Sequence, residues 1–206
     1  MLVIGSKMIN NPILSLHIGD QIATTQRAII DPEDLKVMAY TLTGPLLNDP
    51  EVGDILMTDD VRELGPNGLI IDSIDRLVNR EDIIRLDEVM KLNFNLIGLK
   101  VVSQSGKKIG KIVDYTLDSQ SFMVYQLIVQ RPVMASLIDP QLTINRSQIV
   151  EIDDFKVVIK NGKSEVKVKK ETKADSEDFV PNFVNPFRKP SHAVEDYDDS
   201  SSKISE

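Results

Sequence analysis

Short stretches in which apolar and polar residues alternate recur along most of the chain. The alternation is clear over residues 35–42 and 122–129, and residues 18–22 and 109–113 repeat it. A period of two is typical of half-buried β-strands, because successive side chains of a strand point to opposite faces of a sheet. Turn-forming sequences rich in Gly, Pro, Asn, Asp and Ser separate the stretches. The pattern therefore predicts an all-β protein built from short antiparallel strands.

This strand pattern is present twice. Residues 4–9 are similar to residues 97–102, and residues 61–71 are similar to residues 149–159. The matched segments lie 87 to 93 positions apart, a spread that small insertions or deletions explain. Repetition at a nearly constant spacing indicates two copies of one structural unit. Short strands with a turn about every 8–12 residues favour a small β-barrel for each copy.

A second internal match competes over the middle of the chain. Residues 79–87 are similar to residues 145–153 at a spacing of 66, with better local identity but no counterpart for the apolar residues 69–71. The spacing near 88 keeps strand, turn and strand together and is therefore preferred. Residues 73–93 then become a connector, and the loose helical spacing of their apolar residues predicts a short helix at about 80–91.

Charge distinguishes the parts that these boundaries define. The parts are a first barrel at residues 1–72, the connector at 73–93, a second barrel at 94–170 and a C-terminal tail at 171–206. Lys and Arg number 8 against 16 Asp and Glu in residues 1–92, 12 against 7 in residues 93–170, and 4 against 9 in the tail. Two similar scaffolds of opposite charge are expected to bind different partners.

The amino-acid composition limits the residues available for the core and excludes several kinds of functional site. Of the 206 residues 41% are hydrophobic and 5% aromatic, so the cores must consist mainly of Ile, Leu and Val. Cys is absent, which excludes disulfides, thiol catalysis and Cys-ligated metal sites. The N-terminus lacks the pattern of a signal peptide, and no apolar stretch is long enough to cross a bilayer. A cytoplasmic protein without a membrane span is therefore expected.

The C-terminal tail differs from the rest of the chain in composition. Ser, Asp, Glu and Pro dominate from about residue 170 and the apolar periodicity is lost, which predicts a disordered acidic segment. Residues 179–190 interrupt it with three of the six Phe residues and with prolines that prevent a regular helix. An extended segment of this kind can dock in a groove or add to a sheet edge, in cis or in trans. The candidate partner-binding residues are Phe179, Phe183, Phe187, Arg188 and Lys189.

No residue pattern indicates catalysis. His17 and His192 are the only histidines, and neither has the oriented partner that acid–base chemistry needs, so we interpret them as surface or turn residues. The acidic pairs at 59–60 and 153–154 are explained by a solvated strand edge and a hairpin turn. No catalytic, cofactor-binding or metal-binding residue is predicted, and the protein is not expected to be an enzyme.

Lysines gather in the second copy and form a candidate basic face. They are Lys100, Lys107, Lys108 and Lys111. The surrounding residues 106–111 do not form a phosphate-binding loop, because their second glycine enters a predicted strand rather than a helix. A charged hairpin that keeps a barrel soluble is the alternative interpretation. The absence of interleaved aromatic residues weakens the case for nucleic-acid binding.

Several segments resemble the PRC-barrel family. The resemblance lies in Ile97–Val102, Gly106–Tyr115, Phe122–Val129 and Gln148–Ile159. The first copy fits with divergence at its opening, where Asn10, Asn11 and Pro12 replace a Gly-containing turn. The resemblance implies two tandem small antiparallel PRC-type β-barrels that serve as a non-catalytic assembly module. The family occurs in the H subunit of photosynthetic reaction centres and in a ribosome maturation factor. The chain lacks the membrane helix of the first and the different N-terminal barrel of the second.

The expected function is therefore that of a non-catalytic adaptor or assembly protein that binds other proteins through its barrels. The alternative is a ribosome maturation or RNA-processing factor that binds a ribosomal protein or ribosomal RNA, which the basic second copy favours. No cofactor is expected in either case, and a homo-oligomer is compatible with both.

Overall fold

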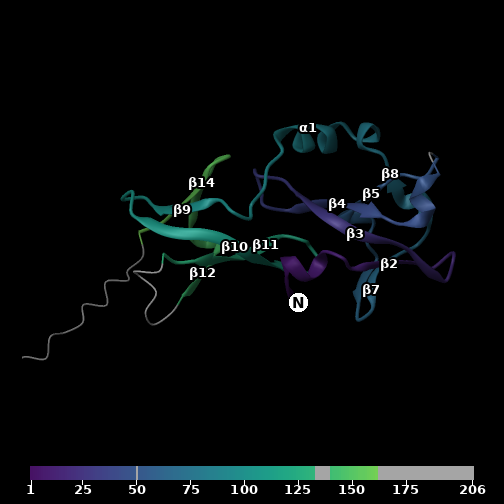
Figure 1. Ribbon diagram of the computed structural model, residues 1–206, viewed down its shortest axis with the longest axis horizontal. Coiled ribbons are helices and arrows are strands. Elements are labelled where there is room, and N and C mark those ends of the chain that lie inside the picture. The colour runs from purple at the N-terminus through teal and green to yellow at the C-terminus, as the bar shows by residue number, and fades with distance from the viewer. Residues whose placement is uncertain (50, 133–139, 162–206) are drawn as a thin grey trace, which may run out of the picture. The chain divides into compact units, whose positions relative to one another are not determined.

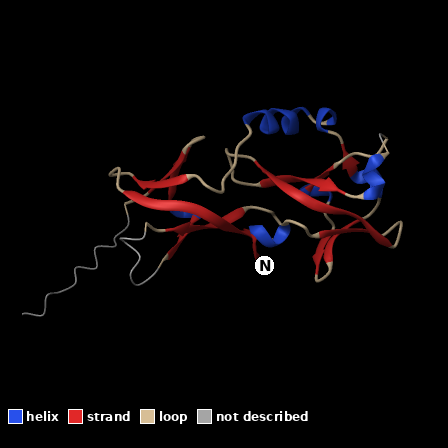
Figure 2. Ribbon diagram, in the orientation of Figure 1, coloured by secondary structure: helices blue, strands red, loops and turns tan. Residues whose placement is uncertain are grey.

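The computed structural model describes residues 1–49, 51–132 and 140–161, which are mostly β-strand with one α-helix (Figures 1 and 2). The prediction of an all-β protein is confirmed. The N-terminal sheet contains β2 (Pro12–Ser15), β3 (Asp20–Ile30), β4 (Val37–Thr43), β5 (Ile55–Met57), β6 (Glu63–Gly65), β7 (Gly68–Ile71) and β8 (Leu77–Val78). The C-terminal sheet contains β1 (Leu2–Ile4), β9 (Lys100–Ser103), β10 (Lys108–Asp118), β11 (Val124–Gln130), β12 (Gln141–Asn145), β13 (Ile149–Ile152) and β14 (Lys156–Ile159). The helix α1 spans Ile84–Leu92, and 3-10 helices span Gly5–Met8, Pro45–Asn48, Thr58–Asp60, Ile74–Arg76, Arg80–Asp82 and Arg146–Gln148.

The two sheets share one strand order. It is β6-β7-β2-β3-β4-β5 in the N-terminal sheet, with β8 beside β5, and β13-β14-β9-β10-β11-β12 in the C-terminal sheet, with β1 beside β10. Most neighbours are antiparallel, but β2 and β7 are parallel, as are β9 and β14. The expectation of wholly antiparallel sheets is therefore wrong. The chain reverses direction between β2 and β7, and between β9 and β14, so that the two strands of each pair run in the same direction. The curl of each sheet brings these two strands together.

The longest strands, β3 and β10, curve both sheets in the same way. Each has 11 residues and pairs with neighbours on both sides. Register shifts interrupt β3 between Thr25 and Arg27 and β10 between Ile112 and Asp114. An extra residue in one strand bends it and increases its twist, so shifts at equivalent places give the sheets similar curvature.

The first strand of the chain lies in the C-terminal sheet. β1 pairs with β10 through Leu2 and Asp118 and through Ile4 and Thr116. The 3-10 helix that follows packs against β10, and a side chain at Gly5 would clash with the ring of Tyr115 on that strand. The first-barrel boundary at residues 1–72 is thus corrected: the N-terminal sheet begins with β2, because the backbone edge beside the end of β10 accepts β1.

The connector at 73–93 is more structured than the sequence predicts. β8 adds an edge strand beside β5. The predicted helix at 80–91 overlaps α1, with a 3-10 turn at Arg80–Asp82 before it. Leu86 and Val89 of α1 are buried against apolar side chains of β3, β4 and β5. This burial explains why a segment without a clean apolar stripe forms a helix here, because two anchor residues suffice when the sheet supplies the partner surface.

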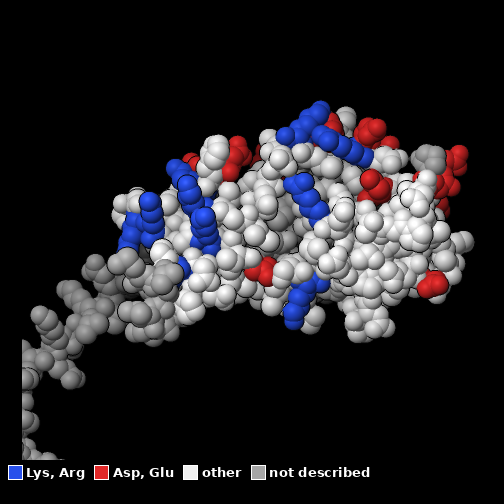
Figure 3. All heavy atoms as spheres, viewed as in Figure 1, with Lys and Arg blue, Asp and Glu red and all other residues white. Residues whose placement is uncertain are grey.

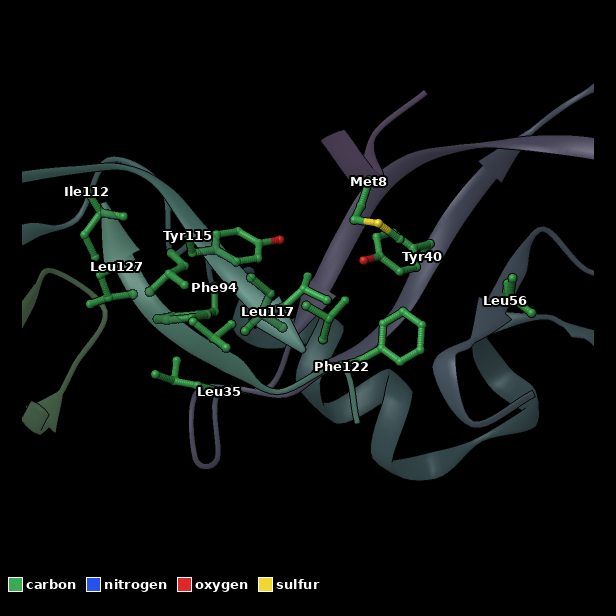
Figure 4. Close-up of a cluster of buried hydrophobic side chains, with 14 of the residues drawn as sticks. Met8, Leu35, Tyr40, Leu56, Phe94, Ile112, Tyr115, Leu117, Phe122 and Leu127 are labelled. Carbon is green, nitrogen blue, oxygen red and sulfur yellow. The ribbon is translucent and has the colours of Figure 1, made fainter. Parts of the chain in front are cut away.

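One hydrophobic core runs through both sheets. The described residues belong to a single compact unit, and the largest buried cluster draws side chains from both halves of it. Figure 4 shows Met8 and Tyr40 of the first half beside Phe122 of the second. The Tyr40 and Phe122 rings meet edge to face, with centroids 6.4 Å apart and planes at 70°, an arrangement that the charge distribution of aromatic rings favours.

Matched turns join the two halves. The N–H of Val37 donates to the carbonyl oxygen of Phe122 at 2.9 Å, and the N–H of Val124 donates to the carbonyl oxygen of Leu35 at 2.9 Å. Leu35 and Phe122 also share a left-handed backbone, with φ of 54° and 55°. Equivalent residues thus exchange equivalent hydrogen bonds, which is the signature of an approximate twofold axis within one chain.

Some predicted features fall outside the described residues. They are residues 162–170 of the expected second barrel, the tail at 171–206 and its segment at 179–190. The last described strand, β14, is paired with β9 on one side and with β13 on the other.

Candidate partner-binding surfaces

Lysines lie side by side across the middle of the C-terminal sheet. Lys100 on β9 is the cross-strand partner of Lys111 on β10 and of Lys156 on β14. Cross-strand partners share one face of a sheet, and neighbouring strands are about 4.8 Å apart. Lys108 is the partner of Val102, two residues along β9 from Lys100, so it lies on the same face. We call Lys100, Lys108, Lys111 and Lys156 the lysine row.

The lysine row faces solvent. All four lysines are exposed, whereas Val101 and Ile112 beside them are buried in the core. Among the described residues only Lys156 of the row has an ionic partner, the carboxylate of Asp153 at 3.6 Å. Figure 3 shows Lys and Arg side chains gathered at the end of the visible face that carries β9 and β10.

Neither sheet stability nor edge protection explains the row. Like charges opposite each other on neighbouring strands destabilise a sheet. Lysines often guard an exposed edge strand, but β9 is flanked by β10 and β14 and has no open edge.

The N-terminal sheet carries no charge at the equivalent positions. The pairing registers make Pro12, Gln21, Thr24 and Gly68 the counterparts of Lys100, Lys108, Lys111 and Lys156. At Gly68 φ is 144°, and an added side chain would collide with the carbonyl oxygen of Pro12. The same scaffold position therefore holds a lysine in one sheet and excludes any side chain in the other.

The structure brings three of the four sequence-predicted lysines into the row. Lys107 lies outside it, in the turn before β10, where its N–H donates to the hydroxyl of Ser103. Lys156 belongs to the row but was missed by sequence reasoning. The alternation after Lys156 predicts a strand, but only the parallel pairing of β14 with β9 places Lys156 beside Lys100.

Acidic side chains of the first half gather around Arg85 of α1. Its guanidinium lies 2.7 Å from the carboxylate of Asp31 and 2.8 Å from that of Glu33. The hydrogen bond and the charge of Asp31 raise the pKa of Arg85 above its usual value. This cluster ties α1 to the turn between β3 and β4.

The remaining sequence candidates have structural roles. His17 is exposed in a turn, which confirms its interpretation as a surface residue. Asp59 contacts the ammonium of Lys36 at 2.6 Å. Asp153 accepts the N–H of Phe155 at 2.8 Å, and this bond lowers the pKa of Asp153. The interpretation of Asp153 as a hairpin-turn residue is therefore confirmed.

Within residues 1–49, 51–132 and 140–161 no group of three or more His, Cys, Asp or Glu side chains is placed to hold a metal ion. No helix in those ranges is long and apolar enough to cross a membrane. The tail candidates Phe179, Phe183, Phe187, Arg188 and Lys189 lie outside the described residues.

One family model matches part of the chain. The family model of the PRC-barrel domain matches residues 88–173, a range that includes every strand of the C-terminal sheet except β1. No curated protein matches the chain.

Proposed function

We propose that this protein, whose residues 88–173 are a PRC-barrel domain, is a non-catalytic adaptor that binds an acidic protein partner through the lysine row. The observation that carries the proposal is the alignment of Lys111, Lys100 and Lys156 on three neighbouring strands. Exposed, aligned cations, most of them without an ionic partner in the described part of the chain, raise the local potential and steer an oppositely charged surface toward it.

A second part of the proposal concerns the first half of the chain. The shared strand order and the matched register shifts support a second, divergent PRC-type barrel in the N-terminal sheet. On this view the two halves are tandem copies, followed by a disordered acidic tail. The first copy acts as a neutral or acidic support that leaves partner recognition to the lysine row.

The surroundings of the row favour a protein over a nucleic acid. Val102 and Val158 are half-buried on the same face, and Val113 is 40% exposed. Apolar side chains beside charges are typical of a protein interface. The neighbour of Lys111 on β11 is Gln130, so Lys111 has no aromatic cross-strand neighbour on which a base could stack.

Matched variants on the two sheets test the proposal. Lys108→Gln with Lys111→Gln removes two charges from the row, and Gln21→Glu with Thr24→Glu lowers the net charge by the same amount at the equivalent positions of the N-terminal sheet. We expect the first pair to weaken capture of an acidic partner about 5- to 30-fold at low salt. The second pair should leave capture unchanged. The measurement is titration of the identified partner against each purified variant.

Equal loss of partner binding in both pairs of variants would mean that net charge alone matters. Unchanged partner binding in both pairs would show that the lysine row is not part of the interface. Either result contradicts the adaptor proposal as stated.

A ribosome maturation or RNA-processing factor is the second candidate, favoured by the same four lysines. If phosphates are the ligand, the logarithm of the binding constant should fall with the logarithm of salt concentration with a slope of about −3 for four contacts on single-stranded RNA. Nuclease treatment should then abolish capture. A nuclease-resistant partner with a shallow salt dependence would exclude this candidate.

A further inference from the structure

A cavity of about 240 Å³ opens where the two halves meet, beside the register shift of β3. It is lined by residues 5, 6 and 9, residues 26–28 and 30 of β3, residues 94–97 after α1, and Tyr115 of β10. Ile30 and Phe94 in this lining are buried, whereas Gln26 and Asn95 are exposed and open the cavity to solvent. We call it the Arg27 cavity. Its size suits a ligand smaller than a drug-sized molecule.

Arg27 gives this cavity a positive charge. Among the described residues that line it, Arg27 alone is charged at neutral pH. Its guanidinium donates to the side-chain oxygen of Asn93 at 3.1 Å and makes no ion pair with another described residue. A guanidinium has five N–H donors in a planar fork that matches a carboxylate. Most of the donors of Arg27 are therefore available to an anion.

The equivalent position of the other sheet has its partner within the chain. Asp114 follows the register shift of β10 as Arg27 follows that of β3. The carboxylate of Asp114 accepts the N–H of Ser6 at 3.1 Å and also the hydroxyl of Ser6. Leu99 is the residue that matches Ser6 in the repeat, and its apolar side chain cannot pair with a guanidinium. The approximate twofold symmetry thus supplies a partner for Asp114 but none at the matching position for Arg27.

A second unpaired donor in the cavity wall is the hydroxyl of Tyr115. Tyr115 is 3% exposed, and its hydroxyl makes no hydrogen bond to another described residue. The ring carbon that bears the hydroxyl lies where a side chain at Gly5 would collide, so this end of the ring lies beside another residue of the cavity wall. Burial, together with the charge of Asp114, raises the pKa of Tyr115. The hydroxyl is therefore protonated at neutral pH and can donate to an anion.

From these observations we propose that the Arg27 cavity binds a small monocarboxylate with a short apolar body, whose carboxylate is held by Arg27 and Tyr115. Ile30, Phe94 and Ile97 supply apolar lining for the body of the ligand. Apolar walls with a few placed polar groups are typical of sites for small molecules. The site is separate from the lysine row, whose lysines do not line the cavity.

Three small ligands test the proposal on the full chain in a buffer without carboxylates. They are 4-methylpentanoate, its uncharged amide, and acetate, which lacks the apolar body. We expect 4-methylpentanoate to bind with a Kd on the order of 1 mM and at least about tenfold more tightly than either of the others. It should shift the amide NMR signals of residues 26–30 and 94–97. Absence of binding, equal binding of the amide or of acetate, or shifts confined to other residues overturns the proposal.

Variants test the two donors separately. Arg27→Gln should weaken binding of 4-methylpentanoate at least about tenfold, whereas Arg27→Lys keeps the charge without the planar fork and should lose less. Tyr115→Phe keeps the ring and should weaken binding about threefold. Arg62→Gln is the control, because Arg62 pairs with Asp72 outside the cavity, and it should leave binding unchanged. Unchanged binding in Arg27→Gln, or an equal loss in Arg62→Gln, would overturn the assignment.

The carboxylate at the end of a peptide shares this chemistry, and a fourth probe distinguishes it from a free acid. The probe is the tripeptide Gly-Gly-Leu with a free C-terminus. Weaker binding of the tripeptide than of 4-methylpentanoate supports a small-molecule site. Tighter binding would assign the cavity to the chain end of a protein and overturn the assignment to a small molecule. Neither result affects the role of the lysine row, which its own variants test.

Discussion

At the residue scale, the core contains one polar group without a partner. The hydroxyl of Tyr40 is buried and makes no hydrogen bond within the described residues. Burial raises the pKa of Tyr40, and the nearby Tyr115 adds to this effect. Tyr40 on β4 is the cross-strand partner of Ala28 on β3. In the second half, Tyr115 on β10 occupies the position equivalent to Ala28, and its partner Leu127 on β11 occupies the position equivalent to Tyr40. Each half thus places one tyrosine in the shared core, from opposite strands of the equivalent pair.

The substitution Tyr40→Phe should stabilise the protein. It keeps the ring and its edge-to-face contact with Phe122 and removes a buried hydroxyl that has lost its hydrogen bonds to water. We expect the free energy of unfolding to rise by about 1 kcal/mol, measured by urea titration with circular dichroism. The half-exposed Tyr125 is the control, and Tyr125→Phe should change stability by less than about 0.5 kcal/mol. Destabilisation by Tyr40→Phe would show that the hydroxyl has a partner.

Asp118 links the end of β10 to the turn that follows. Its carboxylate accepts the N–H of Ser121 at 3.0 Å and contacts the terminal ammonium of Met1 at 3.0 Å. The bond from Ser121, followed by that from the N-terminus, lowers the pKa of Asp118 well below its usual range. Its equivalent in the first half, Asp31, holds Arg85, so each of these turns is fastened by an aspartate.

The lowered pKa of Asp118 makes its contribution to stability depend on pH. A carboxyl group whose pKa is lower in the folded state stabilises the fold above the unfolded pKa of about 4 and loses that contribution as pH falls further. Asp118→Asn should therefore lower the urea midpoint at pH 7, and the difference from wild type should shrink between about pH 4 and pH 2. Asp20→Asn, at an exposed position, is the control. A difference that stays constant with pH would contradict the role of Asp118.

At the element scale, the sequence predicts strands and turns better than pairings. Alternation over residues 122–129 predicted β11, and the turn residues around Gly106, with φ of 79°, predicted the start of β10. The pairing of β1 with β10 could not be predicted, because residues 4–9 are similar to residues 97–102 and suggest membership of the first repeat. Similar local sequence does not specify which sheet edge a short strand joins, since that depends on which edge is open after the rest has folded.

The turns that join the halves offer a test at the element scale. Phe122 is 2% exposed, contacts Tyr40 and holds a hydrogen bond to β4 through its carbonyl oxygen. Phe122→Ala should lower the free energy of unfolding by about 3–5 kcal/mol, because it leaves a cavity between the halves. Phe155→Ala, at an exposed aromatic of the same type, should change it by less than about 0.5 kcal/mol. Both are measured by urea titration.

The shape of the Phe122→Ala transition carries further information. Because one core is shared by both sheets, the variant should unfold in a single transition that all spectroscopic probes report together. Two separate transitions in the wild-type protein would show that the halves fold independently and would contradict a shared core.

At the scale of the whole molecule, the two halves share one core but differ at their exposed positions. The apolar positions serve one continuous core, and the junction at Leu35 and Phe122 joins the halves around an approximate twofold axis. The exposed positions have diverged, with the lysine row on the C-terminal sheet where the N-terminal sheet has neutral residues. An interface built from equivalent residues holds the two halves together, and the proposed function assigns partner binding to the C-terminal half.

The sequence by itself determined the all-β class, the turns and the spacing of the strands, because alternation and turn chemistry are local properties of the chain. It also placed Lys100, Lys108 and Lys111 on exposed positions. Only the tertiary structure decided that Lys156 completes their row and that β1 joins the distant sheet. These features depend on pairings between segments far apart in the chain, and the free energy of such pairings is set by which edges and faces remain unburied once the shared core has formed.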